Sequence, residues 1–70
     1  MSVNIHRFEN ESDIVYNFRK DLIINNMDKI INDGKDINDV IKYSKIITNI
    51  KFKNCKYDSK IIDILDKYFD

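Results

Sequence analysis

The chain has 70 residues, and its 12 basic side chains balance 12 acidic ones, which gives a formal net charge of zero. A chain of this length forms one small domain, residues 1–70, and buries only about 60% of the surface that it exposes when unfolded, so its margin of stability is thin. One cysteine and one histidine exclude an internal disulfide and a set of zinc ligands. We therefore expect neither an elaborate active site nor a bound cofactor or metal.

The distribution of apolar residues excludes a membrane span. The longest uninterrupted apolar run is Leu22-Ile23-Ile24, whereas a membrane helix needs about 18 apolar residues. The first seven residues lack the apolar segment of a secretory signal. Together with the single Cys55, these features predict a cytoplasmic protein in a reducing, intracellular compartment.

The choice of amino acids points to the source genome. Ile, Asn, Lys, Tyr and Phe, whose codons are rich in A and T, account for 41 of the 70 residues, while alanine and proline are absent. This bias is typical of AT-rich genomes, among them those of low-GC bacteria and of many viruses, phages and mobile elements. A viral, phage or mobile-element origin is our hypothesis.

In chain order, the first patterned segment is residues 2–6, where apolar and polar side chains alternate as in a half-buried strand. Residues 48–53 alternate in the same way, so the two segments are candidates to pair into a two-stranded ribbon. An isolated ribbon is only marginally stable in water and requires helices packed against one side. The ribbon makes an α+β fold the alternative to a purely helical one.

Residues 12–33 are predicted to be helical. Apolar residues at positions 14, 15, 18 and 22 share one face, and the pattern continues through Met27, Ile30 and Ile31. Gly34 follows at the position where a helix C-cap favours glycine. Because Asn25-Asn26 interrupts the apolar stripe, the segment is either one helix or two with a short corner, and we favour two.

A further helix should begin after the cap candidate Asp36, with a core face made by Ile37, Val40, Ile41, Tyr43, Ile47 and Ile50. The last helix follows Asp58 or Ser59, either of which can cap it. Within it, Asp63 and Lys67 have the i, i+4 spacing of a favourable ion pair. The predicted fold class is therefore mainly α, with three or four helices.

Two short segments resemble known families. The run Ile30-Ile31-Asn32-Asp33-Gly34-Lys35-Asp36-Ile37-Asn38 resembles the helix end and turn of an ankyrin repeat, although the Thr-Pro-Leu-His signature is missing. The run Val40-Ile41-Lys42-Tyr43-Ser44-Lys45-Ile46 resembles part of the N-terminal four-helix domain of elongation factors of the TFIIS type. The second resemblance implies docking onto transcription-related proteins, but Ile47 stands where that family has glycine. Neither segment assigns the chain to a family.

No group of residues predicts catalysis. Aspartates at 33, 36 and 39, and at 63 and 66, fall on neighbouring helical positions, but such isolated carboxylates are typical of a solvated face or a helix cap. His6 is expected on the surface. For Cys55 we favour a buried apolar role; the alternative is a thiol activated by the neighbouring Lys56. We expect a protein that is not an enzyme.

The zero net charge is a cancellation along the chain. Residues 1–39 carry a net charge of −3, residues 40–60 carry +5 and residues 61–70 carry −2. The basic segment mixes lysines with aromatic rings, the combination that binds phosphates and stacks on bases. The candidate nucleic-acid surface consists of Lys42, Lys45, Lys51, Lys53, Lys56, Lys60, Tyr43, Phe52 and Tyr57. Because the segment has no arginine, we favour the other interpretation, a solvated lysine face whose aromatic residues belong to the core.

The last helix is the candidate partner surface. Its apolar residues form a face broad enough to contact both the core and a partner, and they are Ile61, Ile62, Ile64, Leu65, Tyr68 and Phe69. We predict a non-enzymatic protein-protein interaction or regulatory module that binds another protein or itself, as a homo-oligomer. The alternative function is a nucleic-acid-binding or transcription-associated domain that uses residues 42–60.

Overall fold

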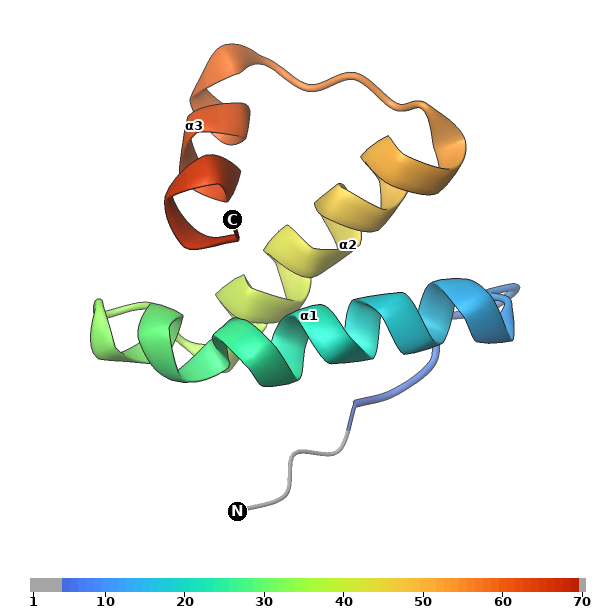
Figure 1. The fold of residues 1–70 in the computed structure, drawn as a ribbon, viewed down its shortest axis with the longest axis horizontal. Helices are drawn as coiled ribbons and strands as arrows, with labels where there is room; N and C mark the ends of the chain where they lie inside the picture. Colours follow the sequence, from blue (N-terminus) through green and yellow to red (C-terminus); the bar gives the residue numbers. More distant parts are fainter. Residues whose placement is uncertain (1–4, 70) are drawn as a thin grey trace.

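The computed structural model describes residues 5–69, which form three helices joined by short connections (Figure 1). The helices are α1 (Asp13–Asn32), α2 (Ile37–Lys53) and α3 (Ser59–Tyr68). Helix α2 crosses α1, and α3 follows α2 after an extended connection that arches over one end of the molecule (Figure 1). The prediction of a small, mainly helical fold is confirmed.

Helix α1 is a single helix, so the favoured prediction of two helices with a corner at Asn25-Asn26 is wrong. The side-chain amide of Asn26 donates a hydrogen bond of 2.9 Å to the carbonyl oxygen of Leu22, one turn earlier, and Asn25 is exposed. Asparagine lowers helix stability only by a fraction of a kcal/mol relative to alanine. Two asparagines therefore do not end a helix that packs on the core both before them, at Ile23, and after them, at Ile30.

The predicted β-ribbon is also wrong in its second segment, because residues 48–53 form the last part of α2. Thr48, which the alternating pattern assigns to the polar side of a strand, is buried, and its hydroxyl donates a 2.7 Å hydrogen bond to the carbonyl oxygen of Lys45. Residues 2–4 of the first segment lie outside the described residues. Within residues 5–69 the structure contains no strand.

Side-chain oxygens cap the first turn of all three helices, and the caps of α2 and α3 are those that the sequence predicts. Ser12 accepts a hydrogen bond from the amide of Val15 before α1, and Asp58 accepts one of 3.0 Å from the amide of Ile61 before α3. Before α2, Asp36 and Asp39 exchange two backbone-to-carboxylate hydrogen bonds of 3.0 and 3.2 Å, which is a capping box. Each cap pairs backbone amides that the first turn leaves without a helical acceptor.

Gly34 lets the chain leave α1 and turn into α2. Its φ of 91° lies in the left-handed region, where side chains other than glycine are strained. The amide of Gly34 bonds to the carbonyl of Ile31, and that of Lys35 to the carbonyl of Ile30, as in a Schellman motif. The predicted C-cap is therefore confirmed, and the turn leaves only a short connection before α2.

The crossing of α1 and α2 is the centre of the core. On α2, Val40, Ser44 and Thr48 follow one another at four-residue intervals and are 1% exposed or less. These small side chains form one ridge, which faces the fully buried Ile23 and Ile30 of α1 across the core. The hydroxyl of Ser44 bonds to the carbonyl of Ile41, so the ridge buries no unpaired hydroxyl within the described residues.

The chain before α1 is tied to that helix by a buried ion pair. The guanidinium of Arg19, only 1% exposed, donates bonds of 2.8 and 3.0 Å to the Glu11 carboxylate and one of 2.6 Å to the carbonyl of His6. It also lies 4.3 Å from the ring centroid of Phe8. The hydroxyl of Tyr16 adds a 2.7 Å bond to the carbonyl of Ile5. These contacts hold residues 5–11 against α1.

The ion pair is expected to make stability depend on pH. The hydrogen bond from Arg19 holds the pKa of Glu11 below its usual 4.5, against the opposing effect of burial. A lowered folded-state pKa means that the stabilisation is complete above pH 4.5 and is lost as the pH falls through the folded-state pKa.

We predict that Glu11→Gln lowers the free energy of unfolding at pH 7 by about 3 kcal/mol, because it leaves a buried guanidinium without a counter-charge. Urea unfolding at pH 7 and pH 3 measures the effect. The difference between wild type and variant should be smaller at pH 3 than at pH 7, because lowering the pH toward the folded-state pKa of Glu11 begins to remove the same charge from the wild type. An equal stability of the two proteins at pH 7 would contradict the importance of the pair.

Candidate functional site

The strongest candidate site is an apolar groove between α2 and α3. It has a volume of about 280 Å³ and is lined by Ile47, Ile50, Lys51, Ile62, Leu65, Asp66 and Phe69. The lining residues of one wall are at positions 47, 50 and 51 and those of the other at 62, 65, 66 and 69, and these spacings place each set on one helical face. Lys51 and Asp66 are the charged residues of the lining, and they lie on opposite walls.

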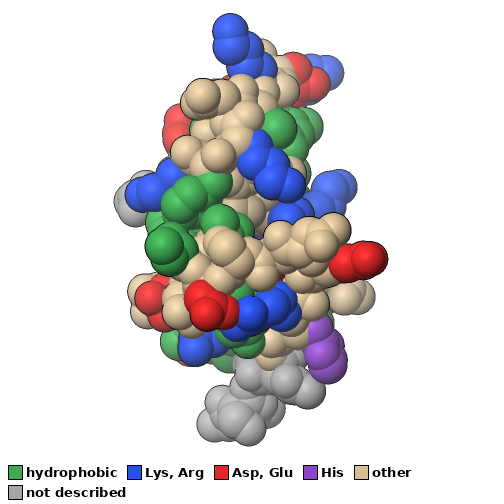
Figure 2. Space-filling view, turned by 90° about the vertical axis from the view of Figure 1, so that its right-hand side faces the viewer, with side chains coloured by type: hydrophobic (Ala, Val, Ile, Leu, Met, Phe, Trp, Pro, Cys, Tyr) green, Lys and Arg blue, Asp and Glu red, His purple; other side chains and the backbone are tan. Residues whose placement is uncertain are grey.

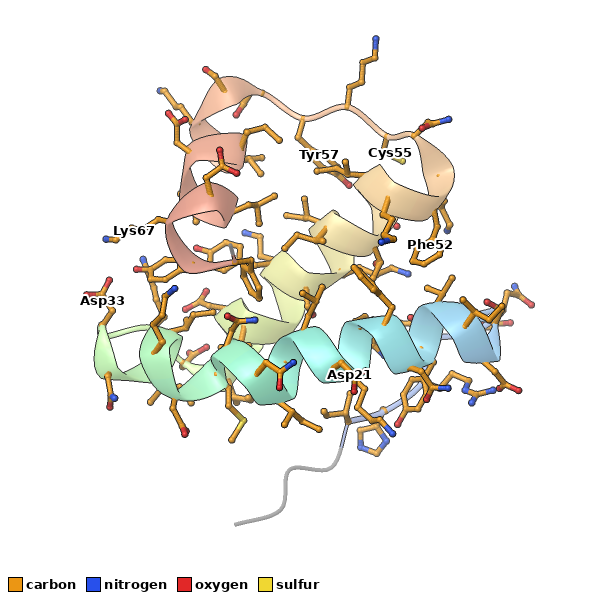
Figure 3. All side chains as sticks on the ribbon, in the orientation of Figure 1. Asp21, Asp33, Phe52, Cys55, Tyr57 and Lys67 are labelled. Atoms are coloured by element: carbon orange, nitrogen blue, oxygen red, sulfur yellow. The ribbon has the colours of Figure 1, made fainter. Side chains whose placement is uncertain are left out.

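The groove exists because α3 is attached near its two ends. At its C-terminal end, the hydroxyl of Tyr68 donates a hydrogen bond to the carboxylate of Asp33, at the end of α1, and the ammonium of Lys67 lies 3.3 Å from the same carboxylate. Figure 3 shows Asp33 and Lys67 at this junction. The ring of Tyr68 also stacks on Tyr43 of α2, with 6.4 Å between centroids.

The pKa values of this junction follow from its hydrogen bonds. The bond from Tyr68, followed by that from Lys67, lowers the pKa of the Asp33 carboxyl. The same contacts with Asp33 raise the pKa of the Tyr68 hydroxyl and of the Lys67 ammonium. Each group is therefore favoured in the protonation state that the junction needs at neutral pH. The predicted pairing of Lys67 with Asp63 is wrong, because Lys67 pairs with Asp33 instead.

The other end of α3 is held through the connection that precedes it. Tyr57 reaches from this connection toward α2 (Figure 3), and its hydroxyl accepts a 3.2 Å hydrogen bond from the side-chain amide of Asn49. Its ring packs against the cluster of Tyr43, Ile46 and Leu65. Between Tyr57 and Tyr68, the ten-residue α3 leaves part of α2 uncovered, and the groove lies there.

The predicted partner surface of the last helix is largely part of the core. Leu65 and Tyr68 are buried, the other four residues are half-buried, and all six pack against the two core clusters. Ile62, Leu65 and Phe69 line the groove. The accessible portion of this predicted surface is therefore the α3 wall of the groove, shared with α2 residues that the prediction did not include.

The predicted nucleic-acid surface is only partly at the surface. Tyr43 is buried and stacked on Tyr68, so it is not available for stacking on a base. Tyr57 is half-buried, whereas Phe52 is 40% exposed and meets Phe18 of α1 edge to face. Among the lysines, Lys45 is half-buried and the others are exposed, namely Lys42, Lys51, Lys53, Lys56 and Lys60.

None of these six lysines forms an ion pair within the described residues. The three ion pairs found among residues 5–69 join Arg7 to Asp13, Arg19 to Glu11 and Lys67 to Asp33, and none involves a lysine of residues 42–60. Two of the lysines instead lie over aromatic rings, Lys45 over Phe8 at 4.7 Å and Lys51 over Phe18 at 4.6 Å. Figure 2 shows basic and hydrophobic side chains interspersed on the side where α1 begins and α2 ends.

Helix α1 carries a surface that the sequence interpretation missed. Ile14 and Ile31 were assigned to its core face, but both are exposed, Ile14 by 73%. They belong to an outward row of six exposed residues, which we call the α1 seam: Ile14, Asn17, Asp21, Ile24, Asp28 and Ile31. The alternating spacing of three and four residues was visible in the sequence. The buried residues of α1, Arg19, Ile23 and Ile30, lie on the opposite side of the helix.

Within the described part of the chain, no three His, Cys, Asp or Glu side chains gather closely enough to hold a metal ion. Cys55 is a free, half-buried thiol. No helix among residues 5–69 is long and apolar enough to cross a membrane. Comparison of the chain with protein-family models, curated proteins and solved structures gives no match.

We predict that Tyr68→Phe loosens α3, because the variant keeps the ring but loses the hydrogen bond to Asp33. Amide hydrogen exchange in α3 should become severalfold faster, with a lower melting temperature. Tyr16→Phe is the matched control, since it removes a tyrosine hydroxyl bonded to the carbonyl of Ile5, away from α3. Unchanged exchange in α3 of the Tyr68 variant would show that the junction does not hold this helix.

Proposed function

We propose that this chain is a small, non-enzymatic protein-binding module whose binding site is the groove between α2 and α3. The observation that supports the proposal is the groove itself, an open apolar depression with two helical walls. A groove of this kind accepts the apolar face of an amphipathic helix, with side chains spaced by three or four residues. Covering apolar surface contributes about 25 cal/mol per Å², before the cost of association.

The proposed module acts by binding alone, without a chemical reaction. Binding in the groove would cover Ile50 of α2, Ile62 of α3 and Phe69, which follows α3. The charged groups it would use are those of Lys51 and Asp66. Such a module regulates a partner by blocking or recruiting it. We further propose a cytoplasmic location in a reducing compartment, because the chain has a single cysteine, and a gene from a virus, phage or mobile element, because its amino acids are biased toward AT-rich codons.

The test is affinity capture from cells of the source organism with the purified chain as bait. A captured protein should be retained by wild type and lost with Ile62→Asn, which places an amide in the apolar wall. Lys51→Glu, at the exposed rim, should weaken capture at least tenfold and does not depend on tolerance of a change in the core. Lys53→Glu is the matched control, because it makes the same charge change on α2 outside the groove lining.

Circular dichroism establishes that each variant keeps its helices. Capture that is equally strong for wild type and both groove variants would overturn the proposal, and so would the absence of any captured protein together with the absence of self-association.

A second candidate, nucleic-acid binding through residues 42–60, is favoured by the lysines that form no ion pair and by the exposed Phe52 beside Lys51 and Lys53. It also covers a transcription-associated role. Opposing it, Tyr43 is buried and the ring of Tyr57 packs inward.

If this candidate is right, the chain binds a labelled single-stranded oligonucleotide at low salt. Log affinity should fall with log salt by about 0.7 for each phosphate neutralised. Replacing Lys53, Lys56 and Lys60 by alanine should reduce both affinity and slope, whereas replacing Lys29 and Lys35 should not. Fluorescence anisotropy measures both quantities, and no binding at low salt removes the candidate.

A further inference from the structure

The α1 seam has the pattern of a helix that packs against another surface. Its six positions follow the three-four spacing that places residues along one line of a helix, as at the contacts of coiled coils. Ile14, Ile24 and Ile31 on this line are 73%, 55% and 43% exposed. Single exposed isoleucines are ordinary, but here three fall on one line of a helix, with polar residues between them.

The seam is unsuited to pairing with another seam. Asp21 and Asp28 alternate with the isoleucines, and Asn17 provides no positive charge. Two seams packed together would bury four aspartates with no cation on the line, which is strongly unfavourable. The complementary surface therefore has to be apolar and to bring a basic group.

The groove between α2 and α3 has both properties. Its walls are mainly isoleucine, leucine and phenylalanine, and Lys51 on the α2 wall forms no ion pair within residues 5–69. Its length also matches the second part of the seam, from Ile24 to Ile31. Ile24 to Ile31 and Ile62 to Phe69 each advance seven residues, about 10 Å of helix rise.

The charges along the chain agree with this pairing. The seam belongs to residues 1–39, which carry a net charge of −3, while the α2 wall belongs to residues 40–60, which carry +5. Asp66 on the α3 wall repels an aspartate, so Asp21 or Asp28 is directed toward the α2 wall and Lys51. One orientation of the incoming helix is thereby favoured over its reverse.

We propose that the groove of one copy of this chain receives the α1 seam of a second copy, with Ile24 and Ile31 in the apolar part and an aspartate beside Lys51. This inference rests on the proposed function, since it names the occupant of the same groove. Seam and groove are different surfaces: α3 packs on the core side of α1, and Figure 3 shows Asp21 projecting from the side of α1 away from α3. A contact between unlike surfaces is heterologous, so each added copy leaves one seam and one groove open unless the assembly closes into a ring.

The experiment exploits this asymmetry. The molar mass of the full chain is measured by light scattering over a range of concentrations. Wild type should rise above the mass of two chains as concentration increases. Ile24→Asp blocks the seam, Lys51→Glu reverses the charge of the groove, and each variant alone should stay close to the mass of one chain.

Mixing the two variants is the decisive step. The intact seam of the Lys51 variant meets the intact groove of the Ile24 variant, so an equimolar mixture should form a complex of two chains and nothing larger. Asn25→Asp and Lys53→Glu are matched controls, because both positions are exposed and lie outside the seam and the groove lining. Both controls should associate as wild type does.

A wild type that stays at the mass of one chain overturns this inference. If capture from cells still depends on Ile62 and Lys51 in that case, the proposed groove function stands with a different occupant. Association that persists in both single variants, or a mixture that forms no two-chain complex, also overturns the pairing of seam and groove.

Discussion

The contact between Tyr68 and Asp33 decides the shape of this small protein. It joins residues 35 positions apart and fixes the end of α3 at the end of α1. The connection that leads into α3 is held against α2 by the hydrogen bond between Asn49 and Tyr57. The ten-residue α3 is thus attached to the end of α1 at its last turn and, through the preceding connection, to α2 before its first turn. Leu65 packs on α2 between these two attachments, and the groove lies where α2 stays uncovered beside α3.

The core between α1 and α2 does not depend on covering the groove, because Ile23, Ile30 and Val40 are fully buried there. The ridge of Val40, Ser44 and Thr48 packs on the core side of α1. The ion pair of Arg19 with Glu11 holds the chain before α1 against that helix. Stability thus depends mainly on α1, α2 and residues 5–11. Helix α3 contributes burial of Leu65 and Tyr68 and leaves an apolar surface at the groove.

Local chemistry in the sequence was sufficient to predict where α1 ends and where α2 and α3 begin. The caps at Asp36 and Asp58 and the glycine at position 34 act within a few residues, so no distant contact decides them. The alternating pattern of residues 48–53 misled because six residues fit a helical face as well as a strand. Thr48 faces the core and Lys51 the groove in the helix that forms. The paired asparagines led to a wrong prediction because asparagine alone does not end a helix, and neither glycine nor proline stands beside them.

The candidate site depended on contacts that a sequence pattern does not contain. The pairing of Lys67 with Asp33 rather than with Asp63 follows from the placement of α3 at the end of α1. The burial of Arg19 requires the chain before α1 to fold back. The groove likewise needs both walls in place, and the sequence indicated only the α3 wall. The three-four spacing of the α1 seam is visible in the sequence. Its exposure follows only from the structure, in which Ile23 and Ile30 are the buried apolar residues of α1.

The central claim is that the seam of one copy occupies the groove of another. The most direct measurement is an isotope-filtered nuclear Overhauser experiment on an equimolar mixture of labelled and unlabelled chains at a concentration where they associate. The account predicts intermolecular contacts from the methyl groups of Ile24 and Ile31 to the ring of Phe69 and the methyl groups of Ile62. Intermolecular contacts between two seams, or contacts that involve neither the seam nor the groove, would contradict it.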